Sequence, residues 1–149
     1  MFKKKYPSIE ELVIKEEWGL SQGTYQDKAI FIRANKGLKK IARHPQYPHQ
    51  VGVAVPLNNP NEHGLPISAE GEQLNEIEDQ LVDALEVKNE SVFVGAISTN
   101  GMREFVFYTS DPEQVIEKIN AVQEKTETHK IQLIIQEDKD WLTYKTMVE

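Results

Sequence analysis

The chain contains no cysteine among its 149 residues. This absence excludes disulfide bonds, thiolate nucleophiles and the zinc or iron–sulfur sites that cysteine ligands build. A protein without disulfides suits a reducing compartment, and we expect it in the cytoplasm. A domain of this length can bury a hydrophobic core without covalent cross-links.

Long hydrophobic runs are also missing, because no apolar segment approaches the roughly 20 residues that a membrane-spanning helix needs. The start of the chain, MFKKKYPSIEELVIKEEW, has a basic run but no apolar stretch behind it. Since a signal peptide needs both, we expect neither secretion nor a membrane contact. No repeat, low-complexity tract or linker interrupts the sequence, which indicates a single domain over residues 1–149.

Familiar catalytic and cofactor-binding motifs are lacking as well. The sequence has no G-x-S-x-G elbow, no HExxH, no Walker loop and no G-x-G-x-x-G after a strand. His44, His49 and His63 fall in a proline-rich region, without the spacing that places two imidazoles on one helix face. We therefore expect no cofactor, and the sequence favours a protein that is not an enzyme without deciding the question.

Charge is unevenly distributed along the chain, which has a net charge of −7. Residues 1–50 carry ten Lys or Arg against five Asp or Glu, whereas residues 51–149 carry seven against nineteen. Nucleic acid is a poor partner for so acidic a protein, because the duplex is itself a dense anion. One basic cluster between Lys36 and Arg43 leaves RNA contact as an alternative. We favour the interpretation that this cluster faces the acidic helix described next, within one molecule or across a dimer.

The order of predicted elements from residue 51 indicates an α+β fold. Alternating valines predict a strand over 51–57, and apolar residues three and four apart predict a helix over 68–87. Two β-rich runs joined by Asn100-Gly101 predict a hairpin, and a second helix that Pro112 opens follows it. A strand over 129–136 comes last. This is the element order of a ferredoxin-like βαββαβ two-layer sandwich.

The remaining segments extend this unit. KAIFIRAN, at residues 28–35, predicts a strand that extends the sheet on its N-terminal side. We expect an N-terminal extension over residues 1–24, a ferredoxin-like core over about 50–137 and a short C-terminal helix within 138–149.

The hairpin also predicts which residues lie opposite each other. A two-residue loop gives three pairs: Thr99 with Met102, Ala96 with Phe105 and Val94 with Phe107. Both faces of the hairpin are then largely apolar, and two helices on one side can cover only one of them. We expect the first twenty residues and the tail from Trp141 to cover the other face, with packing against a second copy as the alternative.

Four strand residues, Arg33, Arg103, Glu104 and Tyr108, are the candidate ligand-binding residues. A strand arginine usually pairs with a carboxylate or extends its charged end to solvent. It can also hold an anionic ligand in a two-pronged contact. Both interpretations stay open from the residues alone.

The acidic stretch QEDKDW carries a second candidate site. Glu137, Asp138 and Asp140 follow a buried strand directly, and clustered carboxylates are the ligands that Mg²⁺, Mn²⁺ or Ca²⁺ prefer. With His129 from the same strand, they define the alternative of a divalent-metal-binding protein or hydrolase. We favour a structural interpretation, in which Asp138 or Asp140 caps the C-terminal helix that Trp141 helps to pack.

Several stretches together resemble a known bacterial family. They are GLP at 64–66, IED at 77–79, VGAISTNGMREFVFY at 94–108 and QEDKDW with a following tyrosine at 136–144. In this order they are similar to domain of unknown function 695 (DUF695), over roughly residues 18–144. The resemblance implies no activity, because the family has no established one and no accepted catalytic residues. Some relatives carry a domain similar to the inhibitors of ribonuclease E, which implies regulation through protein contacts.

Taken together, the sequence predicts a non-catalytic binding or regulatory module that acts through protein contacts. The predicted partner is another protein or a second copy of the chain. The acidic helix over 68–87 would attract a basic surface, since opposite charges steer two proteins together. The metal site and the RNA contact are the two alternatives.

Overall fold

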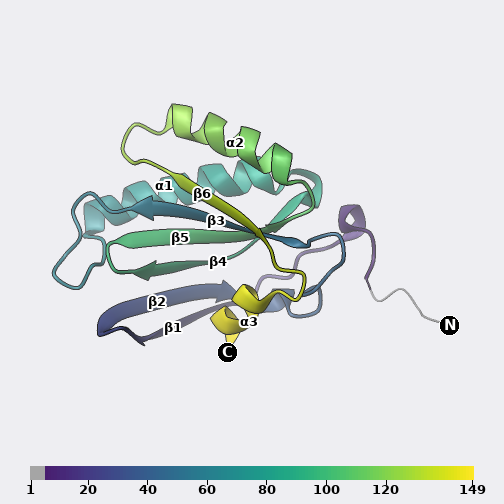
Figure 1. Ribbon diagram of the computed structural model, residues 1–149, viewed down its shortest axis with the longest axis horizontal. Coiled ribbons are helices and arrows are strands. Elements are labelled where there is room, and N and C mark those ends of the chain that lie inside the picture. Colours follow the sequence, from purple (N-terminus) through teal and green to yellow (C-terminus); the bar gives the residue numbers. More distant parts are fainter. Residues whose placement is uncertain (1–5) are drawn as a thin grey trace.

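The computed structural model describes residues 6–149, except for the side chain of Tyr25, and contains one six-stranded antiparallel sheet (Figure 1). The strands are β1 (Trp18–Tyr25), β2 (Lys28–Asn35), β3 (His49–Pro56), β4 (Ser91–Thr99), β5 (Met102–Thr109) and β6 (Gln132–Glu137). The helices are α1 (Ser68–Leu85), α2 (Pro112–Lys125) and α3 (Leu142–Val148), and short 3₁₀ turns lie at Ile9–Glu11, Lys36–Leu38 and Val87–Asn89. The strand order is β1-β2-β4-β5-β3-β6.

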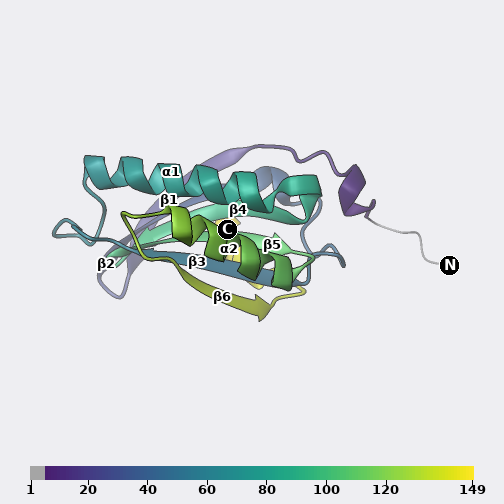
Figure 2. The same ribbon diagram turned by 90° about the horizontal axis from the view of Figure 1, so that it is seen from above.

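Helices α1 and α2 pack on the same face of the sheet, which we call the first face (Figure 2). Leu74, Ile77 and Leu81 recur at spacings of three and four along α1, and each is at least 98% buried. They form one core with residues of α2 and with the valines of β3, which pairs with β5 as the sequence predicts. The predicted mixed α+β protein is therefore confirmed. No helix within residues 6–149 has the length and apolarity to cross a membrane.

A β-bulge in β4 corrects the predicted register of the hairpin. Thr99 pairs with Met102 and Ala96 with Phe105 as expected, but Phe107 lies opposite Phe93 instead of Val94. The bulge arises where β2 approaches β4 closely, since a Cβ on Gly95 would collide with the backbone oxygen of Arg33. As a result, Phe93 packs in the first core and Val94 in the core on the opposite face.

The N-terminal part adds two strands to the sheet, where the sequence predicts one. β2 pairs with β4, and β1 pairs with β2 to form the sheet's outer edge. Gln26 and Asp27, with φ angles of 51° and 64°, make the tight turn between them. Because Gly19, Ser21 and Gly23 replace the bulky residues of an ordinary strand, β1 lacks the apolar alternation that would predict it.

The chain's own ends cover part of the second face. Ile9, Leu38 and Tyr47 pack there with Trp141 and with Tyr144 and Met147 of α3, against the second-face side chains of β4 and β5. The indole of Trp141 donates to the backbone oxygen of Tyr47 at 3.0 Å, and its ring stacks on that of Tyr108. Figure 1 shows α3 at one end of this face. The N-terminal segment and the C-terminal tail, which were the predicted covers, therefore both contribute.

Candidate functional site

The first face is covered over four strands and open over the remaining two. The first core includes residues of β3, β4, β5 and β6, but none of β1 or β2. We call β1 and β2 the N-terminal hairpin. A hollow of about 720 Å³ lies between α1 and the N-terminal hairpin, and a second hollow of about 380 Å³ continues it. The two share Arg33 and Glu78, and we call them together the α1 groove.

Acidic side chains dominate the larger part of the α1 groove. Its lining includes five carboxylates, Glu16, Glu78, Asp79, Asp83 and Glu86, against one cation, Arg33. Two aromatic rings, of Trp18 and Phe93, also line it. The groove thus combines surplus negative charge with aromatic surface, both of which attract cations.

Arg33 lies at the centre of the groove and shows how it accommodates a cation. Its guanidinium forms an ion pair with Glu78 on α1. The same guanidinium lies 5.2 Å from the centre of the Trp18 ring and 5.9 Å from that of Phe93. A guanidinium held by a carboxylate over aromatic faces is a stabilised arrangement.

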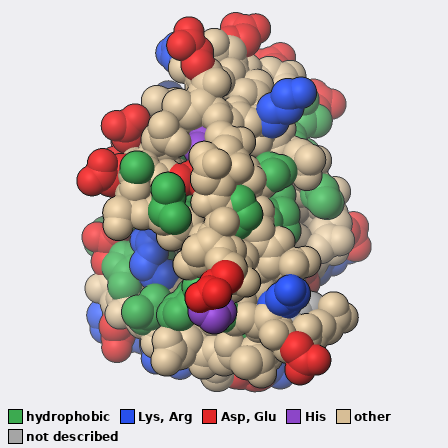
Figure 3. Space-filling view, turned by 90° about the vertical axis from the view of Figure 1, so that its left-hand side faces the viewer, with side chains coloured by type: hydrophobic (Ala, Val, Ile, Leu, Met, Phe, Trp, Pro, Cys, Tyr) green, Lys and Arg blue, Asp and Glu red, His purple; other side chains and the backbone are tan. Residues whose placement is uncertain are grey.

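Arg103 lies in the smaller part of the groove, close to Arg33. Its Nε donates to Ser98 Oγ at 2.9 Å, and one terminal nitrogen lies 3.5 Å from the side-chain oxygen of Asn75. Burial lowers the pKa of Arg103, the positive charge of Arg33 lowers it further, and Glu78 partly offsets both. Figure 3 shows basic side chains bordered by hydrophobic ones on this end of the molecule.

At the end of the groove away from Arg103, Glu86 and Glu16 carry negative charge that no basic side chain of the described residues balances. The carboxylate of Glu86 accepts a hydrogen bond from the backbone N–H of Phe93 at 3.0 Å. Burial raises the pKa of Glu86, the hydrogen bond lowers it and the nearby charge of Glu16 raises it. Within residues 6–149, no side-chain nitrogen of Lys, Arg or His lies within 4 Å of a carboxylate oxygen of Glu16, Asp79 or Glu86.

The four candidate ligand-binding residues divide between the two faces. Arg33 and Arg103 meet in the α1 groove, whereas Glu104 and Tyr108 belong to the second face. Burial raises the pKa of Glu104, which lies opposite Ala54 on the neighbouring strand. The hydroxyl of Tyr108 donates to Asp138, and burial followed by this bond raises its pKa. The four therefore form no common site.

Asp138 holds the start of α3 in place. Its two carboxylate oxygens accept from the backbone N–H groups of Leu142 at 2.9 Å and Thr143 at 3.1 Å. It also receives the hydroxyl of Tyr108 at 2.6 Å. Asp138, three residues before the N-cap position of Trp141, thus satisfies the first two N–H groups of α3, as the structural interpretation of the acidic stretch expects.

Glu137 and Asp140, the acids on either side of Asp138, lie near basic side chains instead of near Asp138. Glu137 lies 3.7 Å from Lys139, and Asp140 lies 3.3 Å from Arg43. No group of three or more His, Asp or Glu suited to a metal ion occurs in the described part of the chain. The structure does not bring these carboxylates together as the metal alternative requires.

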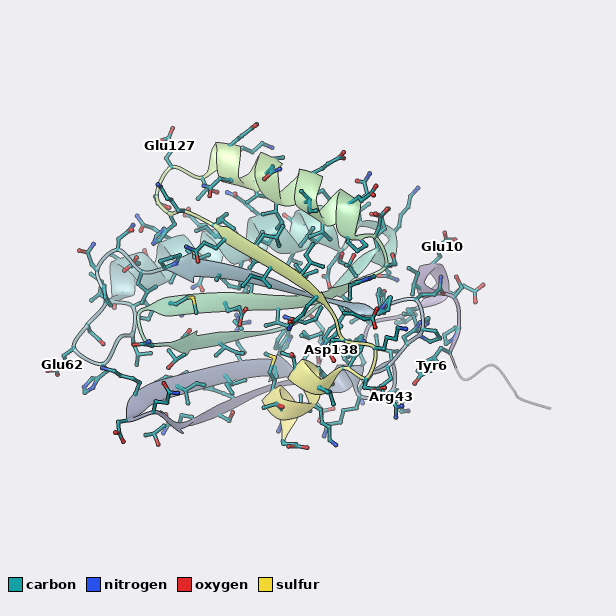
Figure 4. All side chains as sticks on the ribbon, viewed as in Figure 1. Tyr6, Glu10, Arg43, Glu62, Glu127 and Asp138 are labelled. Carbon is teal, nitrogen blue, oxygen red and sulfur yellow. The ribbon has the colours of Figure 1, made fainter. Side chains whose placement is uncertain are left out.

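His129 lies at the opposite end of β6 from Asp138, as the positions of Glu127 and Asp138 in Figure 4 illustrate. Its Nε2 is 2.6 Å from Glu70 Oε2, and both side chains are buried. Glu70 also accepts from the backbone N–H groups of Asn58 and Asn59. Burial raises the pKa of Glu70, but these hydrogen bonds outweigh it and lower the pKa overall. His129 thus fastens a loop to α1.

The basic cluster does not face the acidic helix within the molecule, which corrects the first form of the favoured interpretation; contact across a dimer stays a prediction. Residues 36–43 pack on the second face, whereas α1 lies on the first. Lys39 and Arg43 line a hollow of about 310 Å³ together with Lys145 of α3. The aromatic rings beside it, of Trp141 and Tyr144, are buried, so they cannot stack on bases.

Sequence reasoning found the two arginines of the groove but not their surroundings. The acidic side of α1 is plain in the sequence. Its residues Glu78, Asp79 and Glu86 line the groove only because α1 lies beside β2. Trp18 follows three charged residues and gives no signal of its own. An aromatic residue next to Glu16 and Glu17 was the one feature that could have suggested an acidic, aromatic site.

Comparison with models of known protein families gives a match over most of the chain. The sequence model described as family of unknown function DUF695 matches residues 16–147. No curated protein and no solved structure matches the chain.

Proposed function

The chain belongs to DUF695, a family of unknown function, and from its own geometry we propose a non-catalytic, cytoplasmic module that binds a basic protein surface in the α1 groove. One observation carries the proposal: the open part of the first face is flanked by five carboxylates, of which Glu78 alone pairs with a basic side chain in the described part of the chain. A basic surface would supply the missing cations.

Charge and shape both support such a partner. The negative field of α1 would steer a basic surface toward the groove and speed the encounter. Exposed Leu20 and Trp18, on the rim, would add apolar contact once the partner has docked. Arg33 already occupies one position over the aromatic rings, which illustrates the type of side chain that the groove accepts.

The fold supports the same function by providing a rigid base for the groove. The part of the sheet ordered β4-β5-β3-β6, with α1 and α2 on one face, favours a ferredoxin-like unit. In this proposal the hairpin of β1 and β2 is an extension of that unit, and it creates the groove because neither helix covers it with apolar side chains.

A comparison of two double variants tests the proposal. Asp79→Lys with Asp83→Lys reverses charge in the groove, whereas Glu72→Lys with Glu76→Lys makes the same change on exposed residues of α1 outside it. At low salt we expect the original protein and the Glu72/Glu76 variant, each immobilised, to retain one and the same basic partner protein. The Asp79/Asp83 variant should not retain this partner. High salt should release the partner from the two binding proteins, because counterions screen exposed charges.

Two results would contradict this function. Equal loss from both double variants would mean that net charge alone attracts the partner. Equal retention by both would mean that the partner binds elsewhere on the molecule.

A further inference from the structure

Strand β1 is the outer strand of the sheet, and within residues 6–149 no other segment bonds to its outward backbone groups. Lys36 donates its N–H to the backbone oxygen of Glu17, and the two-residue turn at Gln26-Asp27 ends the pairing with β2. In an antiparallel pair, hydrogen-bonded and non-bonded positions alternate. The odd-numbered residues of β1 therefore bond to β2, and the even-numbered ones direct their N–H and C=O groups outward.

This edge lacks the usual protection against an additional strand. Natural edge strands are blunted by charged residues, proline, bulges or a covering segment. Residues 18–25 contain neither charge nor proline, and their pairing with β2 runs in register without a bulge. Of the described residues of β1, only Gly19 is less than exposed, so no other segment within residues 6–149 covers the strand.

The same even-numbered residues carry side chains toward the α1 groove. Leu20 lies directly opposite Arg33 in the register, and Trp18 lines the groove next to it. Residues opposite each other in a sheet project from the same face. An additional strand on β1 would thus place every second side chain beside Trp18 and Leu20, on the acidic side of the sheet.

We propose that an extended, basic protein segment binds along β1 as a seventh strand, with Lys or Arg at every second position directed into the α1 groove. This inference rests on the proposed function and names the form of the partner. Backbone hydrogen bonds to β1 would hold the segment, and the groove would select its alternate cations.

Charge complementarity favours a basic segment over a second copy of the chain. The side chains that a second β1 would direct into the groove are Trp18, Leu20, Gln22 and Thr24. None of them is a cation, so Glu16, Asp79 and Glu86 would stay without partners. A segment with alternating Lys or Arg supplies the charge on the side of the sheet where the carboxylates lie.

A pair of nonapeptides of equal charge tests the proposal on the full chain. One alternates Arg with Thr, and the other carries its arginines in one block. We expect the alternating peptide to bind roughly tenfold more tightly, since only an extended strand directs all its cations to one face. Equal affinity would overturn the seventh strand but leave the proposed function intact.

Backbone methylation of the alternating peptide gives the sharper readout. The backbone amides of the peptide form two sets, at odd and at even positions, and only one set faces β1 in the proposed complex. Methylation of one set removes half of the peptide's backbone donors. We expect one set to abolish binding and the other to leave it within about twofold. Equal effects of the two sets would overturn the proposal.

Amide hydrogen exchange locates the contact on the protein. Bound peptide should slow exchange about tenfold or more at Leu20 and Gln22, and leave Ser21, which already bonds to β2, unchanged. Slower exchange at amides of α1 without protection of Leu20 and Gln22 would support groove binding and overturn strand addition. Loss of peptide binding in the Asp79/Asp83 variant, with retention in the Glu72/Glu76 variant, would confirm that the groove selects the cations.

Discussion

The two faces of the sheet are closed in different ways. On the first face, two regular helices contribute side chains repeated along their length, such as Leu74 and Leu81, to one apolar core. On the second face, irregular segments from both ends of the chain are fastened by single side chains. Trp141 bonds to Tyr47, and the hydroxyl of Tyr144 donates to the backbone oxygen of Asn35 at 2.6 Å.

The difference teaches where this fold depends on single residues. A helix that loses one apolar contact keeps the others on the same rigid element, so the damage is confined to a cavity. A chain end that loses its central aromatic ring loses the contact that holds several segments together. The first face should therefore yield locally, and the second should open as a unit.

Truncation of one large side chain on each face should give the largest loss of stability among the tests of this comparison. We expect Trp141→Ala to lower the free energy of unfolding by about 4 kcal/mol, and Leu81→Ala by about 3 kcal/mol. Urea denaturation measures both. Hydrogen exchange should separate them further, because Trp141→Ala should also expose amides of residues 36–47, whereas Leu81→Ala should affect α1 alone.

Leu142→Ala is the matched control, since this neighbour of Trp141 is 61% exposed. Its effect should stay within about 0.5 kcal/mol. A loss below about 1 kcal/mol for Trp141→Ala would show that the second face does not depend on this ring.

The buried pair of Glu70 and His129 sharpens the comparison, because it is a single-residue fastening beside the first face. Glu70→Gln should cost about 2 kcal/mol at neutral pH, since it weakens the contacts to His129 and to the loop at residues 58–59. The pKa of Glu70 is lowered in the folded protein, so its contribution is present above the pKa of the unfolded chain. It is lost as pH falls through the folded value.

Stability measured from pH 7 down to acidic pH checks this sign. The difference between the original protein and the Glu70→Gln variant should be constant near neutrality and shrink in acid. A difference that grows on acidification would contradict the assignment of Glu70 as the ionised partner. Glu72→Gln, an exposed neighbour on the same helix, should show no such dependence.

The smallest expected effect concerns the cap of α3. Asp138→Ala should cost about 1 kcal/mol, because it removes the acceptor of the backbone groups of Leu142 and Thr143. Asp140→Ala serves as the control, since its ion pair with Arg43 is exposed and contributes at most about 0.5 kcal/mol. Equal losses in urea denaturation would remove the distinction between the cap and its exposed neighbour.

Sequence reasoning succeeded for the elements that a pattern of neighbouring residues specifies. The spacing of Leu74, Ile77 and Leu81 predicts α1, and Asn100-Gly101 predicts the hairpin, because each pattern depends only on local geometry. It failed at the bulge near Gly95, which the approach of β2 creates. It also predicted only one of the two N-terminal strands, since β1 has small and polar residues where an apolar pattern was expected.

The candidate site divides along the same line. Arg33 and Arg103 were identified because charged residues within strands are conspicuous. Their position in one groove depends on the packing of α1 alongside β2, which joins residues 45 apart in the case of Arg33 and Glu78. Glu104 and Tyr108, although close to Arg103 in the sequence, point to the other face because side chains alternate along a strand.

The amino-acid sequence by itself determined the helices of the first face, the hairpin, an acidic cap before α3 and the excess of acid on α1, since each is set within a few residues. The structure then selected Asp138 over Asp140 as that cap. The tertiary structure alone decided that residues 36–47 join the predicted covers of the second face, and that the groove opens between α1 and β1. These outcomes depend on contacts between residues many tens of positions apart, such as Tyr144 with Asn35. Such pairs leave no periodicity, and only the packing of the whole chain selects them.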